Sequence, residues 1–180
     1  MPTYTPLVRQ ANDFSCGPAA LASCLYYWGV WDGRETELYQ DLGTTCEGTS
    51  GVSIIKVAEG LGLRTQYRNK LTVDDLRVWL AEGWTAILNI QAWGQYDQYT
   101  NFGEVWDDGH YVVLANITNS DIIMMDPSVP GQYAMMSIAE FDERWHDWSD
   151  EGEDREYHTA ILLKGEKVAD LSQPLRIDRE

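Results

Sequence analysis

The segment from residue 9 to residue 29 constrains the fold most strongly, because it joins a polar loop to a helix with a cysteine at the junction. It reads RQANDFSCGPAALASCLYYWG. After Pro18, apolar residues recur every three or four positions, which predicts a helix with one buried face. That face comprises Ala19, Ala22, Leu25 and Tyr26. Proline fits a first helical turn and glycine fits a helix end, so we expect a helix from about Gly17 to about Trp28, stopped by Gly29.

Cys16 lies at the N-terminal end of this expected helix. Unpaired N–H groups and the helix dipole stabilise a thiolate there, so the pKa of such a thiol falls below its usual value of about 8.5. Gln10 lies upstream, where its side-chain amide can turn back beside the backbone N–H of Cys16, as an oxyanion hole requires. Taken alone, a cysteine at such a position is more commonly a small core residue.

Two motifs further along the chain change that balance. They are GHYVVL, from Gly109 to Leu114, and IIMMDPS, from Ile122 to Ser128. Together with Gln10 and the CGPAA run that begins at Cys16, they resemble the bacteriocin-processing peptidase family and its stand-alone relatives in the papain-like cysteine peptidase superfamily. The resemblance spans roughly residues 5 to 148.

The resemblance implies a role for each of four residues. It makes Cys16 the nucleophile, His110 the general base and acid, Asp126 the residue that orients the histidine, and Gln10 the oxyanion-hole donor. It also implies a papain-like α+β fold in which the cysteine helix packs against an antiparallel sheet. Transporter-borne members usually carry Asp directly before the cysteine, where this chain has Ser15. The family's leader-peptide substrate, ending in two glycines, is therefore not carried over to this chain.

The spacing of His110 and Asp126 can be checked against strand geometry. Residues 111–117 and 121–126 read as neighbouring strands joined by a three-residue loop, 118–120. In that register residue 112 faces residue 126, so His110 and Asp126 lie on one face as diagonal neighbours within side-chain reach. Val112, Leu114, Ile122 and Met124 share that face. A loop one residue longer or shorter would place the two on opposite faces.

The charge balance bears on the binding partner. The chain has 29 acidic and 13 basic residues, a formal net charge of -16. Phosphate binding depends on clustered Lys and Arg, so we expect neither a nucleic-acid nor an anionic-membrane partner. A peptide or protein substrate, including a cationic one, is compatible with this charge. A generally acidic surface unrelated to the substrate explains it equally well.

The compartment and the absence of cofactors also follow from the sequence. No run of about 18 apolar residues predicts a membrane span, and the start MPTYTP lacks the pattern of a signal peptide, so a cytoplasmic protein is expected. Three cysteines at residues 16, 24 and 46 argue against a disulfide framework. They lack a Cys-x-x-Cys spacing, and no His-x-x-x-His pair occurs, so we expect no metal and no cofactor.

The remaining chain predicts one domain over residues 1–164 and a polar tail over residues 165–180. Its first third reads as helical, with helices over 33–43 and from a Ser50 cap to about Gly60 or Gly62 with Val52 facing inward. Further helices are expected after Thr72 and over 138–148. Strands are expected over 63–69, 84–91, 132–136 and 158–164.

Residues 92–109 form a long segment without a helical or strand period. It is rich in aromatic residues and leads directly into His110. Long irregular segments in compact domains are commonly functional, so we interpret this one as a lid or a groove wall. A loop packed down by its own aromatic side chains explains the pattern equally well.

Other residues and other activities are alternatives to this assignment. His158 begins an apolar strand but has no Asp-Pro at hairpin distance, His146 is expected to be structural in an amphipathic helix, and Cys24 is expected in the core. The expected activity is a cysteine peptidase. A cysteine acyltransferase or amidase on the same scaffold is an alternative, because a thioester can pass to an amine. The third alternative, a catalytically retired peptide-binding module, is disfavoured because all four site residues are retained.

Overall fold

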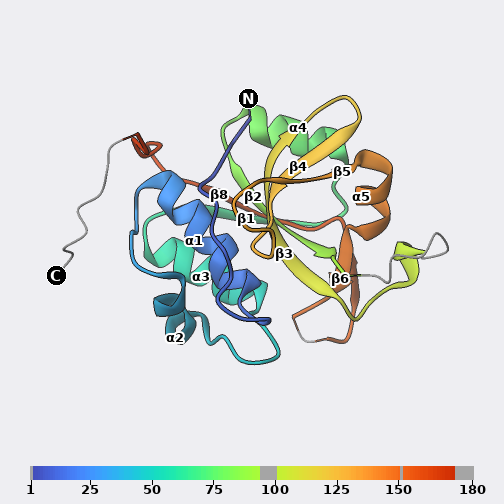
Figure 1. Cartoon of the computed structure of the whole chain (residues 1–180), viewed down its shortest axis with the longest axis horizontal. Helices are drawn as coiled ribbons and strands as arrows, with labels where there is room; N and C mark the ends of the chain where they lie inside the picture. The colour runs from blue at the N-terminus through green and yellow to red at the C-terminus, as the bar shows by residue number, and fades with distance from the viewer. Residues whose placement is uncertain (1, 94–100, 151, 173–180) are drawn as a thin grey trace.

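The computed structural model describes residues 2–93, 101–150 and 152–172. A six-stranded sheet forms its centre, with the order β1-β8-β2-β3-β4-β5 and antiparallel pairing between all neighbours (Figure 1). The strands in this order are Arg64–Arg68, Ala160–Lys164, Thr85–Gln91, Gly109–Ile117, Asp121–Met125 and Ala134–Ser137. A separate ribbon pairs β6 (His146–Trp148) with β7 (Arg155–Tyr157). The α+β fold expected from the sequence is confirmed.

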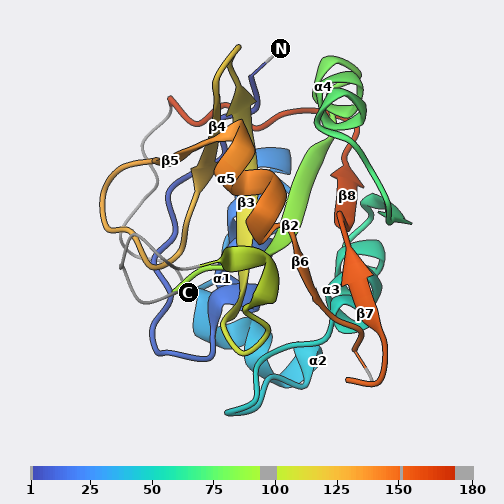
Figure 2. The same cartoon turned by 90° about the vertical axis from the view of Figure 1, so that its right-hand side faces the viewer.

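Helices cover both faces of the sheet (Figures 1 and 2). One face carries α1 (Cys16–Trp28), the 3₁₀ turn η1 (Glu35–Leu38), α2 (Tyr39–Leu42) and α3 (Gly51–Gly60). The other face carries α4 (Val73–Ala81) and α5 (Ile138–Arg144). Side chains alternate across each strand, so Val113 packs in the α1 layer while Val112 and Leu114 pack in the α4–α5 layer.

Helix α1 is buried on nearly every side. The sequence predicts one buried face, but every residue from Gly17 to Leu25 is buried and Tyr26 is half-buried. The N-terminal segment covers the helix, because the Ser23 hydroxyl donates to Thr5 Oγ1 and to the Pro6 carbonyl, both at 2.7 Å. The C-terminal segment adds an Ala169 N–H bond to the Tyr27 carbonyl at 2.8 Å. The division into 1–164 and 165–180 stays a prediction.

Helix ends follow the expected residues more closely than helix faces do. Gly29 adopts φ 63° and ends α1, which fits the preference of glycine for the left-handed region. Ser50 caps α3, since its side chain accepts from the Ser53 N–H at 3.1 Å. Val52, however, is 65% exposed, so the expectation that it faces inward is wrong. The buried face is supplied by Ile54 and by Ala58, and Ala58 is expected to face inward from the sequence.

The register between β3 and β4 differs from the expected hairpin at one end only. Ile117 pairs with Ile122, so the loop is one residue longer than expected. A β-bulge between Leu114 and Asn116 leaves Ala115 without a partner on β4, and beyond it Leu114 pairs with Met124 as expected. The Ala115 carbonyl accepts from the Thr3 N–H at 2.7 Å. The bulge therefore restores the register that places His110 diagonally opposite Asp126.

Helix α5 ends earlier than the sequence predicts. Ser137 caps it through the Glu140 N–H, as expected, but the helix stops at Arg144 rather than continuing to Trp148. Trp145 is fully buried and its indole N–H donates to the Thr159 carbonyl at 2.8 Å, so the chain turns there to fill the core. His146 consequently lies in β6, where the sequence predicts a helix.

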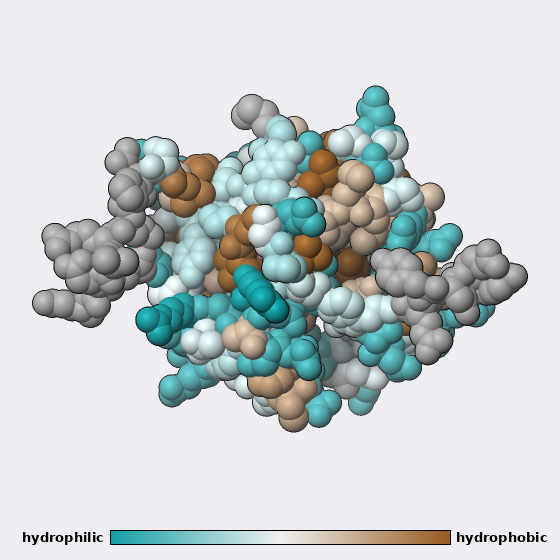
Figure 3. All heavy atoms as spheres, viewed as in Figure 1, coloured by the Kyte–Doolittle hydropathy of each residue, from teal (hydrophilic) through white to brown (hydrophobic). Residues whose placement is uncertain are grey.

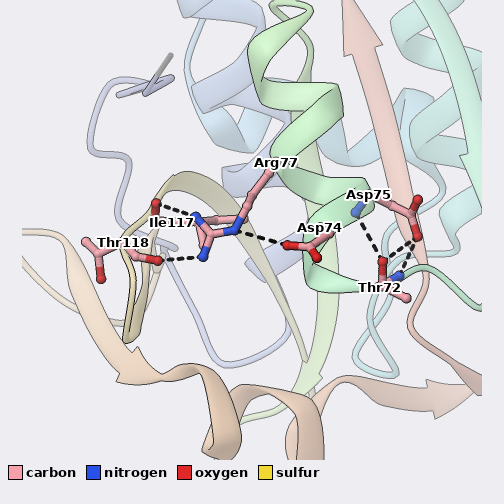
Figure 4. A network of polar contacts seen from close by, with 6 residues as sticks. All are labelled: Thr72, Asp74, Asp75, Arg77, Ile117 and Thr118. Carbon is pink, nitrogen blue, oxygen red and sulfur yellow. Dashed lines mark hydrogen bonds and ion pairs between the residues drawn. The ribbon is translucent and has the colours of Figure 1, made fainter.

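A capping box begins α4 (Figure 4). The Asp75 N–H donates to Thr72 Oγ1 at 3.1 Å, and the Thr72 N–H donates to Asp75 Oδ2 at 2.8 Å. Arg77, further along the same helix, donates to the carbonyls of Ile117 and Thr118 at 3.1 and 2.6 Å. These bonds attach α4 to the turn between β3 and β4, which is the turn that sets the register of the site strands.

The outer surface is mixed in character. On the face shown in Figure 3, hydrophobic residues form small areas separated by hydrophilic ones. Among the described residues, no helix combines the length and apolar character that a membrane crossing requires.

The Thr72 cap gives a stability test. Replacing Thr72 with Ala removes the acceptor for the Asp75 N–H, and loss of such a cap typically lowers the free energy of unfolding by about 1 kcal/mol. Urea denaturation of wild type and Thr72→Ala measures this change. Thr36→Ala, at an exposed threonine in η1, is the matched control and is expected to change stability less. Equal midpoints for the two variants would contradict the role of the cap.

Candidate active site

Cys16 is the first residue of α1 and is half-buried. Burial raises the pKa of its thiol, but a hydrogen bond from His110 and the charge of that ring lower it more. Backbone N–H groups of Tyr111 and Gly17 also lower it by bonding to the sulfur. The net pKa lies below the ordinary thiol value, so the structure favours a thiolate, as the sequence predicts.

His110 is the second residue of β3 and is 2% exposed. Its Nε2 lies 2.7 Å from Asp126 Oδ1, which leaves Nδ1 as the ring nitrogen available to the Cys16 sulfur. Burial lowers the pKa of the imidazole, but the hydrogen bonds and charges of Asp126 and Cys16 raise it to about 9. The pKa of the thiol is lowered and that of the imidazole is raised, and both shifts favour the charged forms.

Asp126 directly follows β4 and is held by the loop after it. Its Oδ1 accepts from the Ser128 N–H at 2.8 Å and from the Ser128 hydroxyl at 2.7 Å. Burial raises the pKa of this carboxyl, but His110 and then Ser128 lower it below the ordinary value. The Asp-Pro-Ser sequence thus supplies both the carboxylate and a side chain that orients it, a role for Ser128 that the sequence analysis missed.

The indole of Trp93 covers the imidazole. The two ring centroids are 5.1 Å apart, and Trp93 is 50% exposed. The residue belongs to the 92–109 segment, for which the sequence predicts a lid or a groove wall. Residues 94–100 of that segment lie outside the described residues, while Phe102–Glu104 form the 3₁₀ turn η2. The lid stays a prediction, and the contact of Trp93 with His110 is a feature that the sequence analysis did not identify.

Gln10 lies beside the Cys16–His110–Asp126 group. Its backbone N–H donates to the Pro127 carbonyl at 3.0 Å, which joins the loop before α1 to the loop after Asp126. Its side-chain Nε2 donates to the Asn12 carbonyl at 2.8 Å. Gln10 and Asn12 line a hollow of about 420 Å³ with Trp93 and Ser128. The structure thus brings Gln10 next to the site, while its role as an oxyanion donor stays a prediction.

A chain of polar contacts fixes the loop before Cys16. The Asn12 amide donates to the Tyr39 hydroxyl at 3.1 Å, and that hydroxyl donates to Glu35 at 2.9 Å. Glu35 is buried, so this chain anchors the loop on η1 and α2. No sequence motif indicates this support, because Asn12 is distant in the sequence from the neighbouring Glu35 and Tyr39.

The remaining cysteines and histidines lie elsewhere. Burial raises the pKa of Cys24 to about 12, and Cys46 is exposed. His146 Nε2 contacts the Val105 carbonyl at 2.7 Å, and His158 Nδ1 contacts the Leu71 carbonyl at 3.0 Å. Cys24 lies in the core, as expected, while a structural role for His146 stays a prediction. Among the residues placed by the structure, no group of three or more His, Cys, Asp and Glu side chains is arranged to hold a metal.

Comparisons with known proteins give one family match and two sequence relatives. A family model described as peptidase C39 matches residues 4–149. An uncharacterized protein of Methanothermobacter thermautotrophicus is 29% identical over 123 residues, which is 68% of this chain and 72% of that protein. A second uncharacterized protein, from Methanothermobacter marburgensis, is 28% identical over 123 residues, with the same 68% and 72% coverage.

Solved structures show the same fold. The peptidase domain of the Streptococcus ABC transporter ComA is 22% identical with a TM-score of 0.66, over 91% of this chain and 100% of that domain. A double glycine motif protease from a PCAT transporter, in complex with its leader peptide, is 20% identical with a TM-score of 0.66 over 91% and 94%. A C39-like peptidase from Bacillus anthracis is 14% identical with a TM-score of 0.66 over 92% and 97%. The papain-like fold is confirmed.

The opposed pKa shifts of Cys16 and His110 predict a pH dependence. In His110→Ala the bond and charge that lower the pKa of Cys16 are lost while burial still raises it. We therefore expect the pH profile for alkylation of Cys16 by iodoacetamide to move to higher pH. The rate at pH 7 should fall about tenfold or more, because the thiolate fraction falls tenfold for each unit of pKa.

Mass spectrometry of the peptide containing Cys16 measures this rate separately from those of the other cysteines. Cys24, with a pKa of about 12, should remain unmodified in the folded protein. His158→Ala is the matched control, because this ring contacts Leu71 and Trp145 rather than the thiol. An identical profile in His110→Ala and wild type would contradict the ion pair.

Proposed function

The chain belongs to the peptidase C39 family, and from this premise we propose that it hydrolyses peptide bonds with Cys16 as nucleophile, His110 as general acid and base, and Asp126 as the orienting residue. A cysteine-type peptidase is the activity of the family, and the assignment of residues is our proposal. The observation that carries it is the 2.7 Å bond of His110 to Asp126 on a ring that also bonds the Cys16 sulfur. These side chains come from α1, β3 and the end of β4.

The first half of the reaction forms an acyl-enzyme. The Cys16 thiolate attacks the carbonyl carbon of the scissile bond, and the carbonyl oxygen takes the negative charge. The imidazolium of His110 then gives its proton to the leaving amine, and the carbon–nitrogen bond breaks. A thioester on Cys16 and a neutral imidazole remain. The depressed pKa of Cys16 and the raised pKa of His110 support this starting state.

The second half returns the enzyme to its starting state. The neutral His110 ring takes a proton from water as the water oxygen attacks the thioester carbon. Collapse of this second tetrahedral intermediate expels the thiolate and releases the carboxylic acid product. Asp126 accepts from Nε2 throughout, so Nδ1 stays directed at the sulfur and the imidazolium is stabilised each time it forms. Ser128 keeps the carboxylate in place.

The oxyanion needs two donors beside the sulfur. The backbone N–H of Cys16 is suited to this role, because the first N–H groups of a helix have no partner within it. We assign the second donor to the Gln10 side chain, whose amide has two N–H groups. One of them donates to the Asn12 carbonyl, which fixes the plane of the amide. The other is then available to the developing charge.

A peptide or protein segment is the proposed substrate. The PCAT transporter protease was solved with a leader peptide, and a peptide ligand for this chain is inferred from that likeness. Acyl transfer to an amine uses the same thioester and stays an alternative, which analysis of the products would distinguish. A retired binding module is disfavoured, because the contacts that ionise Cys16 and His110 serve no purpose in holding a peptide.

The assignment of Gln10 predicts an intermediate loss of activity. Cys16→Ala removes the nucleophile and is expected to abolish cleavage. Gln10→Ala removes one oxyanion donor and is expected to lower the rate on the order of a hundredfold, leaving measurable activity. Mass spectrometry of products from a diverse peptide library compares these variants with wild type. Gln40→Ala, at an exposed glutamine of α2, is the control. A Gln10→Ala rate equal to that of Gln40→Ala would exclude the assigned role.

A further inference from the structure

A second cavity lies on the side of α3, and Tyr111, the residue after His110, is part of its lining. It has a volume of about 240 Å³. Tyr111 connects it to the sulfur, because the Tyr111 backbone N–H bonds to Cys16 and its phenol ring lines the cavity. The opposite wall includes Gly51, where a Cβ atom would lie 3.5 Å from the Tyr111 hydroxyl oxygen. One residue therefore contacts the reacting sulfur through its backbone and lines the cavity with its side chain.

The walls of this cavity suit a long side chain with an aliphatic stem. Aromatic rings come from Tyr67, Tyr111 and Trp148, and aliphatic groups come from isoleucines of α3, β2 and β8. The rim is partly apolar and open, since Val52, Tyr67 and Trp148 are 65%, 39% and 37% exposed. Aromatic faces and aliphatic walls both favour the stem of lysine or arginine, and the aromatic faces also attract the cationic end.

Two carboxylates complete the cavity. Asp150 lies on the turn between β6 and β7, which runs beside the start of α3 (Figure 2). It accepts from the backbone N–H groups of Gly51 and Val52 at 2.8 and 2.9 Å. Glu156 on β7 accepts from the Tyr67 hydroxyl. Neither carboxylate has a basic partner there, because no Lys or Arg is among the described residues that line the cavity.

The pKa values of two tyrosines that line the cavity reflect the negative charge of these carboxylates. Burial raises the pKa of Tyr67, and the bond and charge of Glu156 raise it further. Burial also raises the pKa of Tyr111, and the negative charges of Asp150 and Cys16 raise it further. The lining residue Asn89 has a buried side-chain oxygen without a hydrogen-bond partner. Arg155, which follows Asp154 on the same ribbon, lies over the rings of Trp106 and Trp148 and is not a lining residue.

We propose that this cavity is the subsite for a lysine or arginine side chain of the substrate, within two residues of the scissile bond, and that Glu156 selects its charge. The inference rests on the proposed peptidase function. A neutral aliphatic side chain would bring two carboxylates and the Asn89 oxygen into contact with an apolar group, which costs free energy without a compensating bond. An ammonium or guanidinium group supplies the missing donors and the opposite charge.

Peptidyl chloromethyl ketones test the subsite without a known substrate. The Cys16 thiolate displaces chloride from such a reagent and forms a carbon–sulfur bond, so the rate reports how well the peptide places the reactive carbon. We would compare acetyl-Gly-Lys and acetyl-Lys-Gly reagents with their norleucine counterparts, which have a similar length and no charge. In one of the two pairs we expect the lysine reagent to react about tenfold faster or more.

Glu156→Gln tests the selecting residue. It is preferred to an Asp150 variant, because Asp150 also holds the start of α3. The amide keeps an oxygen acceptor for Tyr67, so the fold is retained while the charge is lost. We expect the preference for lysine to fall several-fold in Glu156→Gln and to persist in Glu143→Gln. The control makes the same charge change on the exposed face of α5.

The outcomes separate this inference from the proposed function. If iodoacetamide modifies Cys16 rapidly but both reagent pairs react at equal rates, the subsite proposal is wrong while the peptidase proposal stands. A lysine preference that survives Glu156→Gln unchanged overturns the role of Glu156. If Cys16 does not react with iodoacetamide near neutral pH, the proposed function fails, and the subsite proposal fails with it.

Discussion

The hydrogen bond between His110 and Asp126 is the interaction on which the rest of the site depends. Its two residues lie on neighbouring strands, so its existence is decided by strand register rather than by the residues alone. The loop between those strands is one residue too long to bring them together. The bulge at Ala115 compensates for this extra residue. The Thr3 N–H donates to the carbonyl of Ala115, which has no partner on β4. A turn, a bulge and the N-terminal segment thus act together to place one imidazole.

That imidazole reverses the effect of burial. Burial alone would raise the pKa of Cys16 and of Asp126 and lower the pKa of His110, which disfavours the charged form of each group. The negative sulfur, the positive ring and the negative carboxylate stabilise one another's charged forms. Each pKa therefore shifts in the direction opposite to the one that burial favours. The charged form of each group is therefore favoured by its neighbour, and removing one group weakens the shifts of the others. The three residues come from separate segments, yet the pKa of each depends on its neighbour.

The sequence predicts the local features of this protein well, because they are decided by neighbours in the chain. The helix stop at Gly29 and the caps at Ser50 and Thr72 are read from single residues or short spacings. The bulge at Ala115 was not predictable in this way, since alanine has no preference for a bulge and its partner is Thr3. The early end of α5 depends likewise on the bond of Trp145 to Thr159, a contact of tertiary structure.

The same distinction holds for the site. Cys16, His110, Asp126 and Gln10 stand in motifs, so the sequence predicts them, and the structure brings the first three into contact. The walls around them have no motif. Trp93 covers the ring from one segment, and the charged cavity combines β1, the start of α3 and the β6–β7 ribbon. Nucleophilic chemistry needs particular residue types, whereas a cavity needs only surfaces that meet in the folded chain. The candidate catalytic residues are therefore predictable from the sequence, and the walls around them are not.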